Sequence, residues 1–400
     1  MPDAKIEKTY VERLPLKYGC NPHQAQAALL TEDGGALPFR VLNGTPGYIN
    51  VLDALNGWQL VRELRQALNL PAAASFKHVS PAGAALGLDL LPMAREVHAA
   101  DEKAFSSLAL AYLRARGADP KSSFGDFAAL SDPVDEATAQ VFKSEVSDGV
   151  IAPGYDKQAL DILKRKKNGN FIVLEADPEY EPPPMEYKEI FGVVFSQQRN
   201  EVQFGPQHLE NRVTKRKQLN DGAVRDLILA SIAIKYTQSN SVGYALDGQM
   251  IGVGAGQQSR VDCTKLAGRK ADTWYLRQHP RVRELPFKAG VRRVDRVNAQ
   301  VRYIEGDFTP NELQAWQALF DPVPELLDGE AKSKWLDDLD GVSLASDAFF
   351  PFRDSIDHAA QHGVKYVVQP GGSVADPSVI EACDEYGMVM AFSGLRLFHH

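Results

Sequence analysis

Cysteine and long apolar runs are scarce in this sequence. Its three cysteines, Cys20, Cys263 and Cys383, lie far apart and form no C-x-x-C pair, which argues against a disulfide framework or a thiolate metal site. No stretch approaches the roughly 18 consecutive apolar residues that a spanning helix needs, and residues 1–10 lack the apolar core of a secretory signal. We therefore expect a reduced, cytoplasmic protein with no membrane function.

Excess positive charge and the common cofactor motifs are also missing. The 44 lysines and arginines are outweighed by 52 aspartates and glutamates, which gives a net charge of −8 and opposes non-specific attraction to nucleic acid. The chain has no G-x-x-x-x-G-K-[ST] phosphate loop and no His-x-Glu with Pro-Cys-x-x-Cys pairing. Gly252, Gly254 and Gly256 lack the dinucleotide-binding spacing and predict a tight turn instead. No redox cofactor is expected.

What is present indicates a soluble globular protein of two or three domains, with 44% hydrophobic and 24% charged residues. Apolar residues at steps of three and four predict a helix over 51–68, and a short apolar run predicts a buried strand over 72–76. Ser80 and Pro81 are predicted to open a second helix as its N-cap and first-turn residue.

A similar layout recurs later in the chain. Helical spacing predicts a helix over 223–236, and Asp247-Gly248 predicts a two-residue hairpin between strands 242–246 and 249–253. An internal duplication is one interpretation of this likeness.

Two further stretches are expected to separate parts of the chain. Residues 175–186 are acidic and proline-rich, which predicts an extended connection between domains. Thr309 to Glu312 form a capping box before an acidic helical piece, which we interpret as an insertion. With strands predicted over 366–368 and 388–392, the alternation of helices and strands favours an α/β fold with covered sheets.

Lys77 and His78 are the pair best suited to chemistry, at the point where a strand becomes a turn. An imidazole can accept and return a proton near neutral pH. Spacing alone leaves two alternatives open: a packed histidine beside a surface lysine, and a lysine that forms a Schiff base.

Three other segments could bind an anion or a flat ring. Residues 17–24 place a cation, a phenol and an imidazole around turn residues, and Arg396 near the end of the chain could reach a phosphate. Residues 349–354 combine aromatic rings with a proline and a carboxylate, although core packing is the commoner role of such a run. The basic run 164–167 predicts a solvated helix end.

Longer strings carry a family resemblance that is collinear from about Leu16 to His400. They read LKYGCNPHQ, VLNGTPGYIN, AAASFKHVSPAGAA, RARGADPKSSFGDF, SDGVIAPGY, KYTQSNSV, GVGAGQQSR, DAFFPFRD and RLFHH. These strings resemble the AICAR transformylase part of the bifunctional purine-biosynthesis enzyme family. The family reaction moves the formyl group of 10-formyltetrahydrofolate to the 5-amino group of AICAR. It gives formyl-AICAR and tetrahydrofolate.

The resemblance also implies a fold and an assembly. The fold would be a duplicated, cytidine-deaminase-like three-layer α/β arrangement with a small helical insertion. The first copy would span 1–185, the second 186–275 plus 340–400, and the insertion 276–339. A homodimer with active sites shared between subunits is implied. Because the first motif starts at Leu16, we expect a stand-alone transformylase that depends on a separate IMP cyclohydrolase.

The resemblance assigns roles to individual residues. His78 would take the proton from the attacking amine, and Lys77 would assist. The AICAR phosphate would be bound by Lys17, Tyr18 and Arg396, and its sugar, carboxamide or ring by Asn43, Asp148, Asn240, Arg260 and Phe349. Folate would lie near Phe124, Pro351 and Asp354, with His400 close to the site. A potassium ion is implied near Thr237, Ser239, Ser241 and Asp347.

One residue departs from the family pattern. The family usually has arginine at the position of Lys17, and an ammonium cannot form the bidentate fork that a guanidinium makes with phosphate. Two rival functions remain at this stage. They are a nucleotide- or folate-binding protein without turnover, and a formyltransferase that uses another donor.

Overall fold

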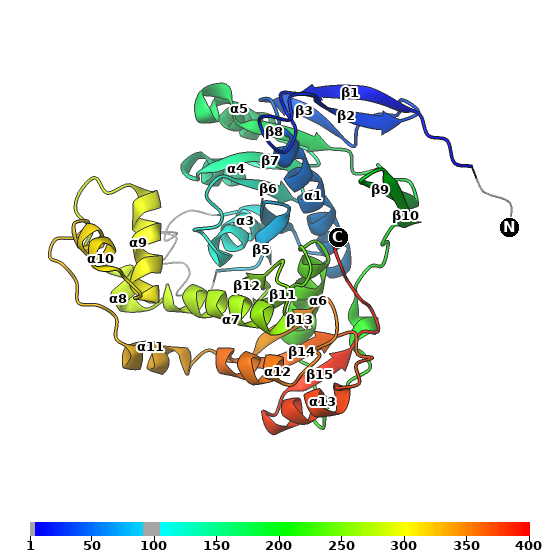
Figure 1. Cartoon of the computed structure of the whole chain (residues 1–400). Helices are drawn as coiled ribbons and strands as arrows, with labels where there is room; N and C mark the ends of the chain where they lie inside the picture. The colour runs from blue at the N-terminus through cyan, green and yellow to red at the C-terminus, as the bar shows by residue number, and fades with distance from the viewer. Residues whose placement is uncertain (1–4, 91–104) are drawn as a thin grey trace.

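A large mixed sheet organises the molecule, as the computed structural model of residues 5–90 and 105–400 shows (Figure 1). Its 11 strands run in the order β15-β14-β13-β11-β12-β5-β4-β6-β7-β8-β3. Two small antiparallel sheets, β1-β2 and β9-β10, stand apart from it. These peripheral strands are β1 (Tyr10–Leu16), β2 (Ala27–Glu32), β9 (Met185–Ile190) and β10 (Val193–Gln198).

The chain builds this sheet from two halves with the same order of elements. The first half consists of α1 (Tyr48–Leu68), β4 (Ala72–Lys77), β5 (Ser80–Leu86), α3 (Ser107–Ala118), β6 (Asp126–Leu130), α4 (Glu136–Ser144), β7 (Ser147–Ala152), α5 (Lys157–Arg165) and β8 (Ile172–Ala176). The second consists of α6 (Asp221–Lys235), β11 (Val242–Leu246), β12 (Gln249–Gly254), α7 (Arg260–Leu276), β13 (Val342–Ser346), α12 (Asp354–Ala359), β14 (Val364–Gln369), α13 (Asp376–Glu385) and β15 (Val389–Phe392).

Strand pairing is the same in both halves. A hairpin (β4-β5 or β11-β12) is followed by a strand antiparallel to the first hairpin strand, and then by two parallel strands. The duplication suggested by the sequence is therefore confirmed in the topology. The two halves meet where β5 lies beside β12, with Ala85 opposite Gln249 as the one registered pair.

Helices cover both faces of the sheet and make three layers. Because side chains alternate along a strand, Ala72, Ala74 and Phe76 pack into one core with α1 and α6, whereas Ala73 packs into a second core with α3. The corresponding core of the second half lies under α7, α12 and α13. The expected three-layer α/β fold is confirmed.

The segment between α7 and β13 is helical and has its own small core. It contains α8 (Pro280–Arg283), α9 (Arg293–Glu305), α10 (Pro310–Gln317) and α11 (Gly329–Leu336), and the predicted capping box at Thr309 is present. Its apolar side chains, among them Tyr303, Trp316 and Phe320, form a separate cluster. Figure 1 shows α9 and α10 to one side of the sheet. The domain boundaries themselves stay predictions.

Two sequence predictions are wrong. Ser80 and Pro81 do not open a helix but begin the strand β5, where a bulge places Pro81 opposite Phe76 and so tolerates the missing N–H. Gly252 and Gly254 do not form a turn but lie within β12. Glycine is needed at both positions because β12 packs closely against α7, where a Cβ would come within 2.1 and 2.2 Å of carbonyl oxygens.

The remaining elements connect these parts. Strand β3 (Phe39–Asn43) pairs with β8 at the sheet edge, and 3-10 turns cover Lys166–Gly169, Pro206–Leu209 and Ala360–His362. The proline-rich stretch has no helix or strand over 177–184 and leads from β8 into β9. No helix within the described ranges is long and apolar enough to cross a membrane.

Candidate active site

His78 and Val79 form the turn of the first hairpin and present the imidazole to solvent. Lys77 pairs with Ser80 across the hairpin, so His78 and Val79 are its two loop residues, with φ of 55° and 61°. Such turns usually take Asn-Gly or Asp-Gly, and a β-branched valine in the left-handed region is strained. His78 is exposed. The alternative of a packed core histidine is therefore wrong for this chain.

A buried carboxylate on α1 holds this strained turn. The Val79 amide donates to Asp53 Oδ1 at 2.6 Å, and Asp53 is only 5% exposed. Burial raises the pKa of Asp53 to about 6, although the hydrogen bond from Val79 works in the opposite direction. Asp53 was not predicted as a functional residue, because its place in the middle of an amphipathic helix gives no sign that it reaches a turn distant along the chain.

The second half contains the same device without the strain. Its hairpin turn is Asp247-Gly248, the ordinary residue pair for this geometry, and the Gly248 amide donates to Asp226 Oδ1 at 2.6 Å. Asp53 and Asp226 both occupy the sixth position of their helices. The two turns lie at opposite ends of the central strands, and only the first contains a histidine.

Lys77, the last residue of β4, and Asp148, near the start of β7, lie at the same end of the sheet as the His78 turn. The Lys77 ammonium donates to the Phe124 carbonyl. A Cβ on Gly125 would lie 3.6 Å from Lys77 Nζ and 3.9 Å from each carboxylate oxygen of Asp148. Both charged groups therefore border one small space that Gly125 keeps open.

Asn43, the last residue of β3, and Lys167, in the turn before β8, approach the same end of the sheet. The Lys167 ammonium forms an ion pair with Asp148, and the Asn43 side chain donates to the carbonyls of Gly169 and Phe171 at 3.0 and 2.7 Å. The predicted solvated helix end is confirmed for Lys164, Arg165 and Lys167, which are exposed after or at the end of α5. Lys167 also has a partner that the sequence did not indicate, because Asp148 lies on a strand that precedes α5.

Arg260, Asn240 and Asp347 form a second group within a closed network. Arg260 donates to the carboxylate of Asp347, to the Ser346 hydroxyl at 3.0 Å and to Asn240 Oδ1 at 2.7 Å. The amide and hydroxyl of Ser241 both donate to Asp347 Oδ2 at 2.9 Å. These side chains fix the loop before β11.

The residues around Lys77 and those around Arg260 lie at the same end of the sheet's strands within a single subunit. At this end of the sheet, β4 and β13 end and β11 begins. The Gln238 amide, two residues before Asn240, donates to the Ser80 hydroxyl at 3.3 Å. The His78 turn and the Asn240 loop are therefore neighbours.

The C-terminal tail returns to this loop. The Leu397 amide donates to the Asp347 carbonyl at 2.8 Å, and the His399 amide donates to the Ser239 hydroxyl at 3.0 Å. Arg396 and His400 are exposed, and each lies near the ring of Phe398.

The other predicted ligand residues differ in placement. Phe349 is 42% exposed, and Pro351 and Asp354 follow it on the way into α12. Lys17 and Tyr18 lie in the loop after β1, outside the large sheet, so they join Arg396 only in the prediction of a phosphate site.

The residues named for potassium belong to the Asn240 loop and the strand end beside it. Ser241 and Arg260 already bond to the Asp347 carboxylate, while Thr237 donates to a carbonyl of α6 and Ser239 accepts from the tail. A cation there would share Asp347 with a buried guanidinium. Potassium stays a prediction.

Together, the fold and this site define a class: a duplicated three-layer α/β protein that presents the imidazole of His78 and the ammonium of Lys77 where β4 ends. A family model described as the AICARFT/IMPCHase bienzyme matches residues 1–270. The chain belongs to that family.

Curated relatives agree with this assignment. The bifunctional purine biosynthesis protein PurH of Aquifex aeolicus is 34% identical over 398 residues, which are 97% of this chain and 61% of that protein. The proteins of the same name from Cereibacter sphaeroides and Roseobacter denitrificans are each 32% identical, over 96% of this chain and 59% of theirs. The chain thus spans about three fifths of the length of these relatives.

Proposed function

We propose that this chain transfers the formyl group of 10-formyltetrahydrofolate to the 5-amino group of AICAR, giving formyl-AICAR and tetrahydrofolate. The observation that carries the proposal is the exposed imidazole of His78, held by a strained turn beside the Lys77 ammonium. Membership of the AICARFT/IMPCHase family supports the same reaction.

The chemistry explains why a positioned base is needed. The 5-amino group shares its lone pair with the imidazole ring and the carboxamide, so it is a weak nucleophile until its proton is being removed. His78 would accept that proton as the nitrogen attacks the formyl carbon. The bond from that carbon to N10 of the folate then breaks, and N10 takes up a proton. A positioned base is typically worth about 10²- to 10⁴-fold in rate.

Lys77 would act on the oxygen of the migrating formyl group. Its ammonium is oriented by the Phe124 carbonyl and lies one residue from His78. A fixed positive charge stabilises the negative charge that develops on a carbonyl oxygen during attack. Holding both substrates at this edge would add the advantage of proximity.

The other predicted residues enter the proposal as ligands. Asn43, Asp148, Asn240, Arg260 and Phe349 would contact the sugar, carboxamide or ring of AICAR, and Lys17, Tyr18 and Arg396 its phosphate. Folate would lie near Phe124, Pro351 and Asp354, with His400 nearby. The proposal includes a homodimer in which subunits share these residues, and a cyclohydrolase that draws formyl-AICAR away.

Substitution of His78 by asparagine tests the proposal. Asparagine adopts the left-handed conformation more readily than histidine, so His78→Asn removes the base while keeping the turn. We expect unchanged thermal stability and a fall of about 10²- to 10⁴-fold in kcat, measured as AICAR-dependent release of tetrahydrofolate. His358→Asn, on α12, is the matched control.

Each outcome decides between functions. Full activity in His78→Asn would remove His78 from the mechanism. Wild-type protein that binds AICAR and folate without turnover would favour a binding protein, and covalent trapping of Lys77 by borohydride would indicate a Schiff-base enzyme.

A further inference from the structure

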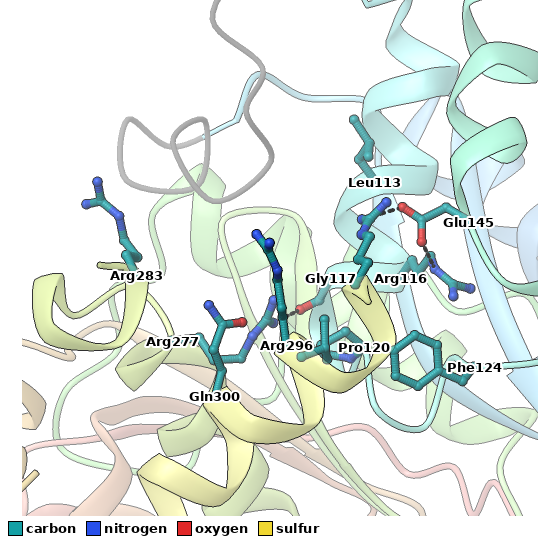
Figure 2. Close-up of a pocket in the computed structure, with 12 residues that line it drawn as sticks. Leu113, Arg116, Gly117, Pro120, Phe124, Glu145, Arg277, Arg283, Arg296 and Gln300 are labelled. Atoms are coloured by element: carbon teal, nitrogen blue, oxygen red, sulfur yellow. Dashed lines mark hydrogen bonds and ion pairs between the residues drawn. The ribbon is translucent and has the colours of Figure 1, made fainter. Parts of the chain in front are cut away.

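A cavity of about 220 Å³ lies between α3 and the helices that follow α7 (Figure 2). Its lining includes five arginines and one glutamate, which is an unusual concentration of positive charge in a chain with a net charge of −8. These residues, which we call the arginine pocket, are Arg116, Arg277, Arg283, Arg293, Arg296 and Glu145.

Glu145 compensates two of the five arginines. It accepts from Arg116 Nε at 2.8 Å, and its other oxygen lies 2.6 Å from Arg293 Nη2. Arg116 also pairs with Asp126 at 2.7 Å. These contacts explain Arg116 and Arg293 as parts of the fold. Arg277 and Arg296 are different, because neither forms an ion pair with a residue in the described ranges.

Arg277 is buried with very little compensation. It is 9% exposed, and its Nη1 donates to the Gly117 carbonyl at 2.8 Å. Its Nε has no hydrogen-bond partner among the described residues. Burial lowers the pKa of Arg277 to about 10. In the described part of the chain it forms no ion pair. An uncompensated buried cation is costly, which is typical of a group that an anion neutralises when it binds.

Arg296 reaches the pocket from α9. Its Nε donates to the Val291 carbonyl at 3.0 Å, and its guanidinium lies 5.4 Å from the centre of the Phe287 ring. It forms no ion pair with any residue in the described ranges. Figure 2 shows Arg277, Arg296 and Gln300 together on one side of the pocket, with the Phe124 ring on the other.

Phe124 connects the pocket to the proposed active site. Its carbonyl accepts from Lys77, while its ring lines the pocket. An elongated ligand could therefore place a reactive end beside Lys77 and His78 and an anionic end among the arginines.

We propose that the arginine pocket binds a ligand group with two or more carboxylates or phosphates. Two sources share this chemistry: the glutamate tail of the folate co-substrate, and a separate polyphosphate. The folate source rests on the proposed function, whereas anion binding itself does not. Guanidinium groups suit both ligands because they pair with carboxylate and phosphate oxygens in the same bidentate geometry.

Two pocket variants and one matched control test the proposal. Arg296→Gln removes one exposed cation, and Gln300→Glu adds a negative charge without removing an arginine. Arg292→Gln is the control, because Arg292 is exposed, pairs with Asp295 and does not line the pocket. Binding is measured by titration calorimetry with inorganic tripolyphosphate. KM is measured for 10-formyltetrahydrofolate with one or with five glutamates.

The tripolyphosphate measurement needs no turnover. We expect wild type and Arg292→Gln to bind it, with affinity that falls as salt rises, and both pocket variants to bind at least tenfold more weakly. Absence of binding in wild type, or equal binding in all variants, would overturn the proposal.

The KM comparison identifies the source. If the folate tail occupies the pocket, five glutamates lower KM at least tenfold in wild type, and the pocket variants lose this advantage while keeping kcat with one glutamate. Equal KM values together with tripolyphosphate binding support the site and assign it to a separate polyphosphate. If wild type binds tripolyphosphate but shows no formyl transfer, the arginine pocket is supported as an anion site and the proposed function is rejected.

Discussion

The buried carboxylate beneath the His78 turn gives a quantitative prediction. Asp53→Asn keeps a side-chain oxygen that can accept from the Val79 amide but removes the charge. Burial raises the pKa of Asp53 from 3.8 to about 6. A pKa about 2 above its ordinary value means that the folded protein disfavours the ionised carboxylate by about 3 kcal/mol.

The sign of the pH dependence follows from this direction. The pKa of Asp53 is higher in the folded protein than in the unfolded chain, so protonation of Asp53 stabilises the folded protein. This stabilisation is complete when the pH is below the pKa of Asp53 in the unfolded chain. It is lost as the pH rises through about 6. Linkage places about 1.4 kcal/mol of this loss between pH 5 and pH 7.5. Asparagine does not titrate, so the unfolding free energy of Asp53→Asn should rise relative to wild type by about that amount over this range.

Urea unfolding at the two pH values, followed by tryptophan fluorescence, measures the difference. Asp221→Asn, an exposed carboxylate on α6, is the control and should run parallel to wild type. If Asp53→Asn also runs parallel to wild type, Asp53 does not bury a charge and the account of the turn is wrong.

The remaining predictions concern thiols and close packing. Cys20 is exposed, whereas burial raises the pKa of Cys263 to about 11, so a thiol reagent should label Cys20 at once in native protein and Cys263 only on unfolding, as mass spectrometry of digests can show. Gly252→Ala places a Cβ 2.1 Å from the Ala267 carbonyl oxygen, and we expect it to lower the unfolding free energy by about 1–3 kcal/mol in urea. Gly256→Ser is its comparison, because nothing lies within 4 Å of a Cβ at Gly256; its positive φ alone should give a smaller loss.

Much of the scaffold could be predicted from local patterns. The helix over 51–68 and the Asp247-Gly248 hairpin are confirmed, since apolar spacing and turn chemistry act over a few residues. Ser80-Pro81 misled because the same two residues suit either the start of a helix or the start of a strand beside a bulge. Packing decides between the two, because Gly83 has no side chain and so allows α3 to lie close to the strand β5.

The site was predictable only where a single residue carries the signal. His78 stood out as an imidazole at a strand end, and the structure leaves it exposed. Asp53 and Lys167 could not be found in the same way. Their partners, Val79 and Asp148, lie 26 and 19 residues away and are brought near by the fold.

The join between the two halves has a consequence for how the molecule opens. One registered ladder pair and the bond from the Leu86 amide to the Gly248 carbonyl link the backbones of β5 and β12. Side chains provide further ties, such as the buried ion pair between Lys235 and Glu63 at 2.7 Å. We expect amide exchange to resolve two protected blocks, separated at this seam, whose protection is lost at different urea concentrations.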